Sequence, residues 1–235
     1  MGALAGCQES GFDESRETQR PLKVQDAMNP LTGTKVPGQA ERPATLTSDT
    51  LGDTLALGVT PVVASDVPKY MSAEAAGVRV VKDTDLSGIR AATPDVILGT
   101  KDGQGEEYGE LSKIAPTIMT EDDDWKLNLR EHGEALGRTN DAEELLTDWD
   151  NRVARVKRMI GDQKVAATVS AAPGTGEFDL GPESPGGSTL ADLGIALRRP
   201  GQHADRVIRI SGGAAWVSGG VLGARARLAD IATAL

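Results

Sequence analysis

Short apolar runs alternate with amphipathic segments along the first half of the chain, and a turn follows each run. Val96–Leu98 is such a run and follows Pro94, which ends the preceding helix, so it predicts a strand buried on both faces of a parallel sheet. The glycine-rich segment 99–105 predicts a turn, residues 106–113 a helix and residues 117–120 the next strand. Ligands of such βαβ units bind outside the carboxyl ends of the strands, so the loop Thr100–Glu106 is the first candidate site.

The same alternation occurs upstream. Residues 45–64 predict a short strand, a helix that ends at Leu57 with Gly58 as its stop, and a strand at Pro61–Ala64. Residues 78–81 continue this alternation and lead through Asp85–Ala92 into Pro94, which ends a helix. Repeated strands and helices of this kind indicate an α/β fold.

The middle of the chain is helical. Acidic residues 122–124 precede a helix at Trp125–Leu136, which Gly137 ends. Asn140 and Glu143 have the spacing of a capping box for the next helix. Apolar residues recur in that helix at three- and four-residue steps as far as Ile160, so residues 140–160 predict one long amphipathic helix that Gly161 closes.

Five sequence blocks carry a family resemblance: KVPGQAERPATL, DTLALGVTPVVA, DLSGIRAATPDVILG, YGELSKIAPTI and WKLNLREHGEALGR. In this order, over roughly residues 35–160, they resemble the iron–siderophore substrate-binding proteins of bacterial ABC importers. The resemblance implies an α/β fold of two Rossmann-like lobes with parallel sheets, joined by one long helix. Residues 140–160 are in the right place for that helix, and a plain core helix is the alternative.

The resemblance divides the chain into four parts. Residues 1–34 are expected to be a disordered lipoprotein tether, 35–138 the N-terminal α/β lobe, 139–161 the inter-lobe helix and 162–235 the C-terminal α/β lobe. Residues 164–170 predict the first strand of that lobe, and residues 216–235 resemble the closing turn and helix of the family. Between Pro200 and Trp216 the family has a further strand–helix–strand passage, so the second lobe is expected to be shortened, by a deletion or by incomplete sequence. A shortened lobe would leave sheet edges and apolar faces uncovered.

The net charge and the cysteine content limit the possible partners and the cellular location of the protein. The net charge of −10 in 235 residues argues against nucleic acid as a partner. The single cysteine, Cys7, lies in LAGC, which resembles a lipobox and implies lipidation and an extracytoplasmic, membrane-anchored protein. Three residues before LAGC are too few for a signal peptide, so either the chain starts late in its reading frame or the motif is coincidental.

A metal site formed by the protein is not expected. The two histidines, His132 and His203, have no spaced partners, which argues against zinc and manganese importers. A siderophore carrier needs no such site, because the chelator supplies the hard oxygen ligands of ferric iron. The carrier needs a cleft with basic donors and aromatic surface.

Few residues fit that requirement. Lys101 follows the strand at 96–99 directly and should face the cleft, opposite Trp216 in the closing turn. The full set of predicted ligand contacts is Lys101, Trp216, Arg198, Arg199, Tyr70 and Tyr108, each of which could instead be a surface charge or a core ring. Where many relatives carry an arginine after the first strand of the second lobe, this chain has Ala171-Ala172-Pro173, which favours a less anionic chelate.

Docking to a permease is also implied by the resemblance. In the family one exposed glutamate per lobe pairs with permease arginines, and the matching positions are Glu106 or Glu107 in the first lobe and Glu183 in the second. A helix-start acid with no further role is the alternative for the first two. The resemblance implies a monomer that reaches the membrane through its lipid anchor only.

No motif of an enzyme stands out, since the chain has neither a Gly-x-Ser-x-Gly elbow nor a complete phosphate loop. The sequence therefore predicts a solute carrier that delivers a ferric siderophore to an ABC permease. The alternatives are the same fold binding haem or a corrinoid, and an interaction remnant whose cleft is degenerate.

Overall fold

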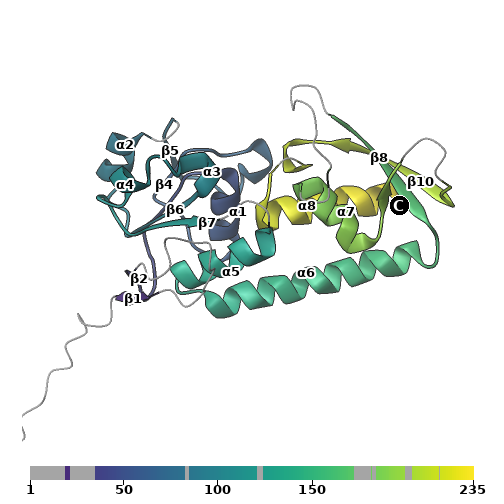
Figure 1. The fold of residues 1–235 in the computed structure, drawn as a ribbon, viewed down its shortest axis with the longest axis horizontal. Helices are drawn as coiled ribbons and strands as arrows, with labels where there is room; N and C mark the ends of the chain where they lie inside the picture. Colours follow the sequence, from purple (N-terminus) through teal and green to yellow (C-terminus); the bar gives the residue numbers. More distant parts are fainter. Residues whose placement is uncertain are drawn as a thin grey trace, which may run out of the picture.

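The computed structural model describes residues 19–21, 35–82, 85–120, 124–171, 181, 184–198, 203–216 and 218–235. Two lobes lie side by side, and one long helix, α6 (Thr139–Ile160), runs beneath both (Figure 1). Each lobe has a sheet in which every strand pair is parallel. This is the α/β class with two lobes and a long joining helix that the sequence predicts.

The N-terminal lobe is built on a five-stranded sheet of order β5-β4-β3-β6-β7. Its strands are β3 (Pro43–Thr45), β4 (Val63–Ala64), β5 (Arg79–Val80), β6 (Val96–Thr100) and β7 (Thr117–Thr120). All residues of β6 and β7 are buried, which confirms both predicted strands. The chain adds β4 and β5 on one side of β3 and then β6 and β7 on the other, so the order in which strands are added reverses between β3 and β6, while all strands stay parallel.

The helices that connect these strands begin and end where local chemistry dictates. They are α1 (Ser48–Ala56), the 3-10 helix η2 (Lys69–Met71), α2 (Leu86–Ala91), α3 (Lys101–Gln104), α4 (Tyr108–Leu111) and α5 (Trp125–Ala135). The side chains of Thr47, Asp85 and Asp124 accept backbone N–H hydrogen bonds at the starts of α1, α2 and α5. Gly58 and Gly137 follow α1 and α5 with φ of +76° and +71°, as expected of helix stops.

The segment after β6 differs from the prediction. A turn was expected at 99–105 and a helix at 106–113, but α3 begins directly after Thr100 and α4 covers only Tyr108–Leu111. The reason is a local cap, because Thr100 Oγ1 accepts the hydrogen bond of Gly103 N at 3.2 Å. The helical turn therefore starts at the strand end itself.

Helix α6 confirms the prediction of one continuous helix. It covers Thr139–Ile160 and ends at Gly161, whose φ is +62°. The buried face consists of Ala142, Leu146, Trp149, Val153, Val156 and Ile160. The expected capping box at Asn140 is wrong, because the N-cap is Arg138 and no side chain caps this helix.

The C-terminal lobe has a three-stranded sheet of order β10-β8-β9. Its elements are β8 (Val165–Ala171), α7 (Pro185–Leu193), β9 (Ala196–Leu197), β10 (Arg206–Gly212), the 3-10 helix η3 (Ala214–Trp216) and α8 (Gly220–Ala234). Exposed apolar faces were expected here. In the described residues the outward positions of β8 and β10 are instead polar, with Thr168 paired to Arg209 and Ser170 to Ser211.

One strand lies within the expected tether. Gln19–Pro21 forms β1, which pairs antiparallel with β2 (Lys35–Pro37). The prediction of a structureless spacer is therefore wrong at these three residues, because backbone pairing to β2 orders them without any apolar periodicity in their own sequence. The rest of residues 1–34 lies outside the described chain.

The two lobes share a hydrophobic core. One cluster joins Leu98 and Ile118 of the first sheet to Ile208 of the second through Trp149 of α6. Trp125 and Trp149 meet edge to face within it, with ring centroids 5.2 Å apart. No helix in the described residues is both long and apolar enough to cross a membrane.

Candidate functional site

The carboxyl ends of β3 and β6 lie side by side at the point where the strand order of the sheet reverses. Leu46 O, just after β3, accepts hydrogen bonds from Ser65 Oγ at 2.6 Å and from Gln104 Nε2 at 3.4 Å. Gln104 Oε1 accepts from Thr100 N at 3.2 Å, so this one side chain holds the two strand ends together. Parallel α/β sheets bind ligands at this position.

Polar side chains gather at this edge. We call Thr47, Ser65, Thr100 and Lys101 the strand-end rim. A Cβ atom at Gly103 would lie 2.7 Å from Thr100 Oγ1 and 3.8 Å from Thr47, so the caps of α3 and α1 are close neighbours. Thr100 is buried and caps α3, whereas Thr47, Ser65 and Lys101 are partly exposed. These three side chains and the N-terminus of α1 suit a ligand rich in oxygen or negative charge.

A buried hydrogen-bond network joins the lobes behind this rim. Asp53 Oδ2 of α1 lies 2.8 Å from His132 Nδ1 of α5, and both side chains are 1% exposed. Asp53 Oδ1 accepts from Val221 N at 2.8 Å, so a carboxylate of the first lobe caps α8, whose own N-cap residue is glycine. This residue therefore couples the two lobes.

The network also orders a hydroxyl, an imidazole and a carboxylate in line, because Thr120 Oγ1 lies 3.4 Å from His132 Nε2. Such a line resembles a catalytic triad. Thr120, His132 and Asp53 are all buried, so no substrate reaches the hydroxyl in this conformation. The arrangement is structural. The sequence showed no spaced metal-ligating partner for His132, and the structure gives it a hydrogen-bond partner, Asp53, that lies 79 residues away.

A second polar junction lies between η2 and α8. Arg227 is fully buried; its Nε donates to Thr189 Oγ1 at 2.7 Å and its Nη1 to Ala215 O at 2.5 Å, while Nη2 has no hydrogen-bond partner. Burial lowers the pKa of Arg227 to about 10, so the group stays charged at neutral pH. Burial also raises the pKa of Tyr70 to about 12, against the opposing effect of the Ser218 hydroxyl.

Three of the predicted ligand residues, Lys101, Tyr70 and Tyr108, lie in the N-terminal lobe. Lys101 is half-buried in the first turn of α3, at the carboxyl end of β6. Tyr70 lies on η2 with its ring half-buried and its hydroxyl enclosed without a hydrogen-bond partner. Tyr108 packs against the apolar cluster of the first lobe, beside Leu111, which is the core role that was its alternative.

Trp216 requires a correction. It was expected to face Lys101 across a cleft, but its side chain is 0% exposed and its Nε1 donates to Asp230 Oδ2 at 2.9 Å. The ring fills the shared core and supports the start of α8, so it presents no surface to a ligand in this conformation. An indole with a buried hydrogen-bond partner satisfies both its apolar and its polar requirement inside the fold.

The remaining predicted residues are on the surface or outside the described chain. Arg198 is exposed after β9, where its backbone N donates to Ala167 O. Glu106 is exposed and Glu107 half-exposed in the turn before α4. Arg199, Glu183 and Cys7 lie outside the described residues.

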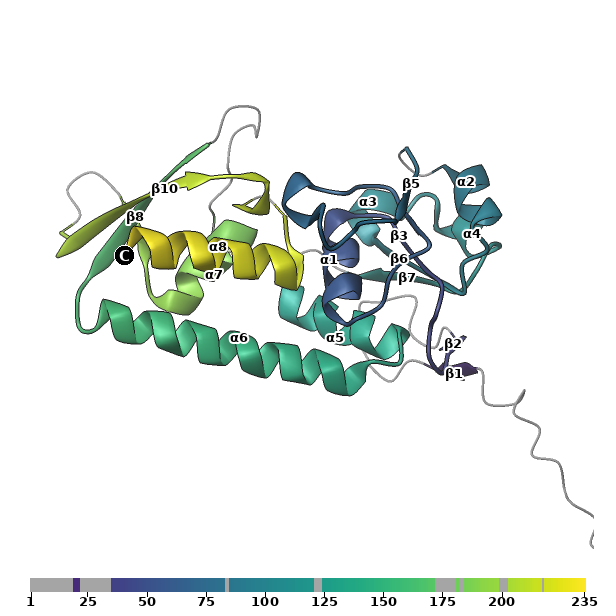
Figure 2. The same cartoon turned by 180° about the vertical axis from the view of Figure 1, so that it is seen from behind.

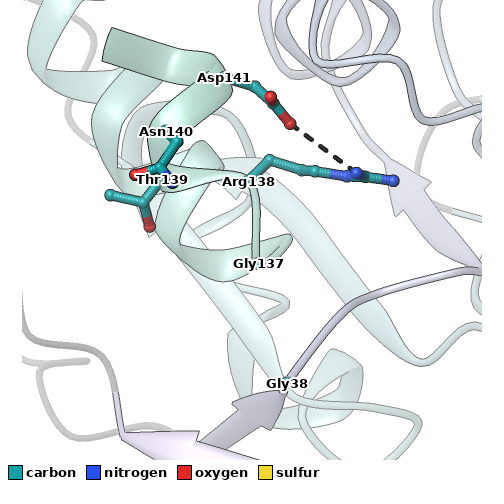
Figure 3. Close-up of a pocket in the computed structure, with 6 residues that line it drawn as sticks. All are labelled: Gly38, Gly137, Arg138, Thr139, Asn140 and Asp141. Atoms are coloured by element: carbon teal, nitrogen blue, oxygen red, sulfur yellow. Dashed lines mark ion pairs between the residues drawn. The ribbon is translucent and has the colours of Figure 1, made fainter.

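A hollow of about 350 Å³ lies at the turn between α5 and α6 (Figure 3). Gly38, Gly137, Arg138, Thr139, Asn140 and Asp141 line it, and Arg138 Nη1 lies 3.8 Å from Asp141 Oδ2. Gly137 approaches the backbone of Gly38 so closely that a Cβ atom there would clash with the Gly38 carbonyl. The turn between α5 and α6 therefore requires glycine at position 137. The hollow lies away from the strand-end rim.

The described residues contain no group of three or more His, Cys, Asp or Glu side chains that could hold a metal ion. Sequence reasoning missed two buried polar residues that hold elements together, Asp53 and Arg227. His132 lies seven residues after Trp125 and three after Leu129, on the apolar face of its helix, which was a signal that a buried polar partner exists. The identity of that partner depends on tertiary packing.

Comparison with known proteins agrees with this architecture. Residues 44–198 match the family described as Periplasmic binding protein. The chain is 30% identical over 173 residues to the probable siderophore-binding lipoprotein YfiY of Bacillus subtilis, covering 68% of this chain and 53% of YfiY. It is 31% identical over 126 residues to the ferric enterobactin-binding periplasmic protein FepB of Escherichia coli, covering 51% and 40% of the two chains. The chain thus spans about half the length of the curated relatives that it matches.

The fold agrees with solved structures as well. The siderophore-binding protein BauB superposes with a TM-score of 0.70 at 17% identity, covering 92% of this chain and 98% of BauB. At 17% sequence identity, this structural similarity shows a shared fold. The two lobes with parallel sheets, the helix beneath both and the match over residues 44–198 agree, and the chain belongs to the periplasmic binding protein family.

Proposed function

We propose that this chain is the extracytoplasmic solute-binding component of an ABC importer, and that it carries a ferric siderophore between its lobes. The match to YfiY over 173 residues supports this proposal most strongly, because YfiY is named as a probable siderophore-binding lipoprotein. FepB is named for ferric enterobactin, and the BauB structure holds two acinetobactin molecules with ferric iron.

The site chemistry is compatible with that cargo. The strand-end rim offers the partly exposed hydroxyls of Thr47 and Ser65, a helix N-terminus and Lys101, which suit the oxygen-rich outer surface of a ferric chelate. In this proposal the iron keeps the hard oxygen ligands of its chelator. The protein would then bind the outside of the complex.

Titration of the purified chain with ferric siderophores tests the proposal. Ferric hydroxamates, catecholates and carboxylates should be compared with haem and a corrinoid, following quenching of tryptophan fluorescence. We expect micromolar or tighter binding of at least one ferric siderophore. If only haem or the corrinoid bound, that compound would be the ligand in place of a siderophore. If no compound of any class bound, the carrier function would be contradicted.

Lys101 provides a sharper test of the rim. Lys101→Ala should weaken an anionic ferric complex by about 1–3 kcal/mol, the range for a lost charge-assisted contact. Lys157→Ala, which removes an exposed lysine from α6, should leave the affinity unchanged. Equal affinities in both variants would mean that Lys101 does not contact the ligand.

Delivery to a permease is the second half of the proposal. Glu106 and Glu107 lie in the exposed turn after α3, beside the rim, where a permease could reach them. Charge reversal of both should impair uptake and leave siderophore affinity unchanged. Asp150→Lys, an exposed change on α6, is the control, and normal uptake by the double variant would remove the docking role from this turn.

Anchoring belongs to the same proposal. Cys7 in LAGC would carry the lipid and Glu183 would supply the docking charge of the second lobe, and both lie outside the described residues. Mass spectrometry of the protein from membranes would detect an acylated Cys7. An unmodified cysteine there would contradict the lipid anchor.

A further inference from the structure

The charge of this protein is divided unevenly along the chain. Residues 1–150 contain 14 basic and 28 acidic residues, a net charge of −14, whereas residues 151–235 contain 11 and 7, a net charge of +4. The positive charge is concentrated in residues 151–164, which hold five basic residues and one acidic residue, Asp162. A basic end on an acidic protein indicates a surface for an anionic partner.

The helix dipole accounts for only part of this positive charge. Cations are stabilised within the last turn of a helix, and Lys157 and Arg158 lie in the last turn of α6. Arg152 and Arg155 lie before that turn, and Arg225 lies on a different helix, α8. These three arginines line one hollow, so the packing of α8 beside α6 brings them together.

This hollow lies between α8 and the second half of α6 and has a volume of about 280 Å³. Figure 2 shows the two helices running beside each other towards the same end of the molecule. Each helix contributes four residues that follow one another at steps of three, one and three, which places them on one face of that helix. The lining residues are Arg152, Arg155, Val156 and Met159 of α6 and Arg225, Leu228, Ala229 and Ala232 of α8. We call this feature the α6–α8 hollow.

The arginines of the α6–α8 hollow retain donor groups that the protein does not use. Arg152 and Arg225 share one carboxylate, because Asp148 Oδ2 lies 2.7 Å from Arg152 Nε and 2.8 Å from Arg225 Nη2. Arg225 Nε is buried without a hydrogen-bond partner, and Arg155 is exposed and has no partner among the described residues. Three guanidinium groups and one carboxylate leave a net charge of +2, which suits a phosphate group.

Apolar side chains follow the arginines along the α6–α8 hollow. Val156 and Leu228 are buried where they line it, and Met159 is 56% exposed. Val80, in the other lobe, is the other large apolar side chain that the described residues expose to this degree. An exposed apolar side chain beside clustered cations is typical of a protein surface that lies on an anionic membrane.

We propose that the α6–α8 hollow binds the headgroup of an anionic phospholipid, so that this end of the molecule rests on a membrane surface. The lipid phosphate lies at the arginines, and the Met159 side chain enters the boundary between the headgroups and the acyl chains. A soluble anion would use the arginines but would leave Met159 in water, so a lipid fits the whole hollow better. The family resemblance implies contact with the membrane through a lipid anchor only, and this surface is a second contact. It is independent of the ligand that the lobes carry.

The acidic part of the molecule determines its orientation on the membrane. Asp150 lies nine residues before Met159, about 13 Å along α6 at ~1.5 Å per residue, which exceeds the screening length of about 8 Å at physiological salt. An anionic surface attracts the second half of α6 and repels the first half. The protein therefore meets the membrane with its C-terminal lobe, and the contact is reversible and sensitive to salt.

Co-sedimentation of the full chain with lipid vesicles tests the proposal. The protein carries Cys7→Ser, so that no acyl chain contributes to binding. Vesicles of phosphatidylglycerol and phosphatidylcholine in equal parts should bind it about tenfold or more tightly than vesicles of phosphatidylcholine alone, and binding should weaken as NaCl rises from about 0.05 M to about 0.5 M. Equal binding to both kinds of vesicle would overturn the proposal.

Two truncations with matched controls locate the contact. Arg155→Ala should weaken binding to the anionic vesicles about fivefold, which corresponds to ~1 kcal/mol for one cation near such a surface. Arg90→Ala removes an exposed arginine from α2 in the other lobe and should bind like the wild type. Met159→Ala should also weaken binding about fivefold, because it removes the inserted side chain, whereas Val80→Ala should not. Wild-type affinity in Arg155→Ala or in Met159→Ala would overturn the proposal.

Inorganic phosphate distinguishes a lipid from a free anion as the occupant of the α6–α8 hollow. At constant ionic strength, millimolar phosphate should leave the protein bound to the anionic vesicles. Displacement would show that the hollow takes the free anion and would overturn its assignment to a membrane. Circular dichroism of each variant should match the wild type, so that a change in binding reports on the surface.

Discussion

At the scale of single residues, the Asp53 carboxylate connects the two lobes. Its two oxygens serve different lobes, one accepting from His132 and the other from Val221 N. Both contacts are buried, so neither partner can turn to water if the carboxylate is lost. An unsatisfied buried group costs about 1–3 kcal/mol.

Asp53→Ala should therefore lower the free energy of unfolding by about 2–5 kcal/mol, because it leaves two buried donors without acceptors. Urea denaturation measures the loss. Asp53→Asn keeps an oxygen for one of the two donors and should lose less. A change below about 0.5 kcal/mol in the alanine variant would show that the network does not hold the lobes.

Tyr70 presents the reverse case, a buried hydroxyl without a hydrogen-bond partner. Tyr70→Phe removes that hydroxyl and should be neutral or stabilising by up to about 1 kcal/mol. A loss of stability above that size would mean that the hydroxyl has a partner such as Ser218. Equilibrium unfolding in urea gives the value.

The same residue predicts a pH effect. Burial raises the pKa of Tyr70 from 10.0 to about 12, so between these values the folded protein keeps a proton that the unfolded chain releases. The stability that this group contributes is complete below pH 10 and is lost as the pH rises towards 12. Tyrosinate absorbance should show a late step that Tyr70→Phe removes. A step already complete near pH 10 would contradict the raised pKa.

At the scale of elements, the packing of α5 against α6 depends on one glycine. A Cβ atom at Gly133 would lie 2.6 Å from Ala142 Cβ and 3.2 Å from Arg138 O. No side chain fits at that distance, so the absence of one allows the two helices to meet directly. Helix propensity favours alanine here, and the tertiary contact favours glycine.

Gly133→Ala should consequently destabilise the protein by about 1–3 kcal/mol, the usual cost of overpacking, although alanine is the better helix former. Thermal unfolding measures it. Gly109→Ala on α4 is the control, because nothing lies within 4 Å of that position, and it should be neutral or stabilising. Adding Ala142→Gly should recover part of the loss; no recovery would place the strain elsewhere.

At the scale of the whole molecule, the lobes are not independent. One apolar cluster that includes the buried face of α6 contains residues of both lobes. The hydrogen bond from Val221 N of α8 to Asp53 of α1 links the lobes a second time. Trp125, Trp149 and Trp216 all lie in this cluster, so tryptophan fluorescence reports on the shared core, whereas circular dichroism reports on the helices of both lobes. Elements that share a core unfold together.

Urea unfolding should therefore give one transition, with coincident midpoints by fluorescence and by far-ultraviolet circular dichroism. The reason is that residues of both sheets pack in the same apolar cluster with α6, so the loss of that cluster exposes both sheets to water. Two separated transitions would show that each lobe has a sufficient core of its own.

The sequence by itself determined the local elements and their order. Strands at 96–98 and 117–120, helix stops at Gly58, Gly137 and Gly161, and the continuity of 140–160 follow from apolar spacing and from the φ freedom of glycine, which are properties of neighbouring residues. The resemblance over residues 35–160 supplied the two-lobe architecture. The apolar run before Lys101 predicted that this residue follows a strand, and it lies directly after β6.

Only the tertiary structure decided which side chains are buried between the lobes. Trp216 lies in a glycine-rich turn that suggests exposure, yet the core of α6 and α8 encloses it. Asp53 and His132 meet across 79 residues of sequence. Burial and pairing depend on what lies opposite a residue in space, and that information is not contained in the spacing of its neighbours along the chain.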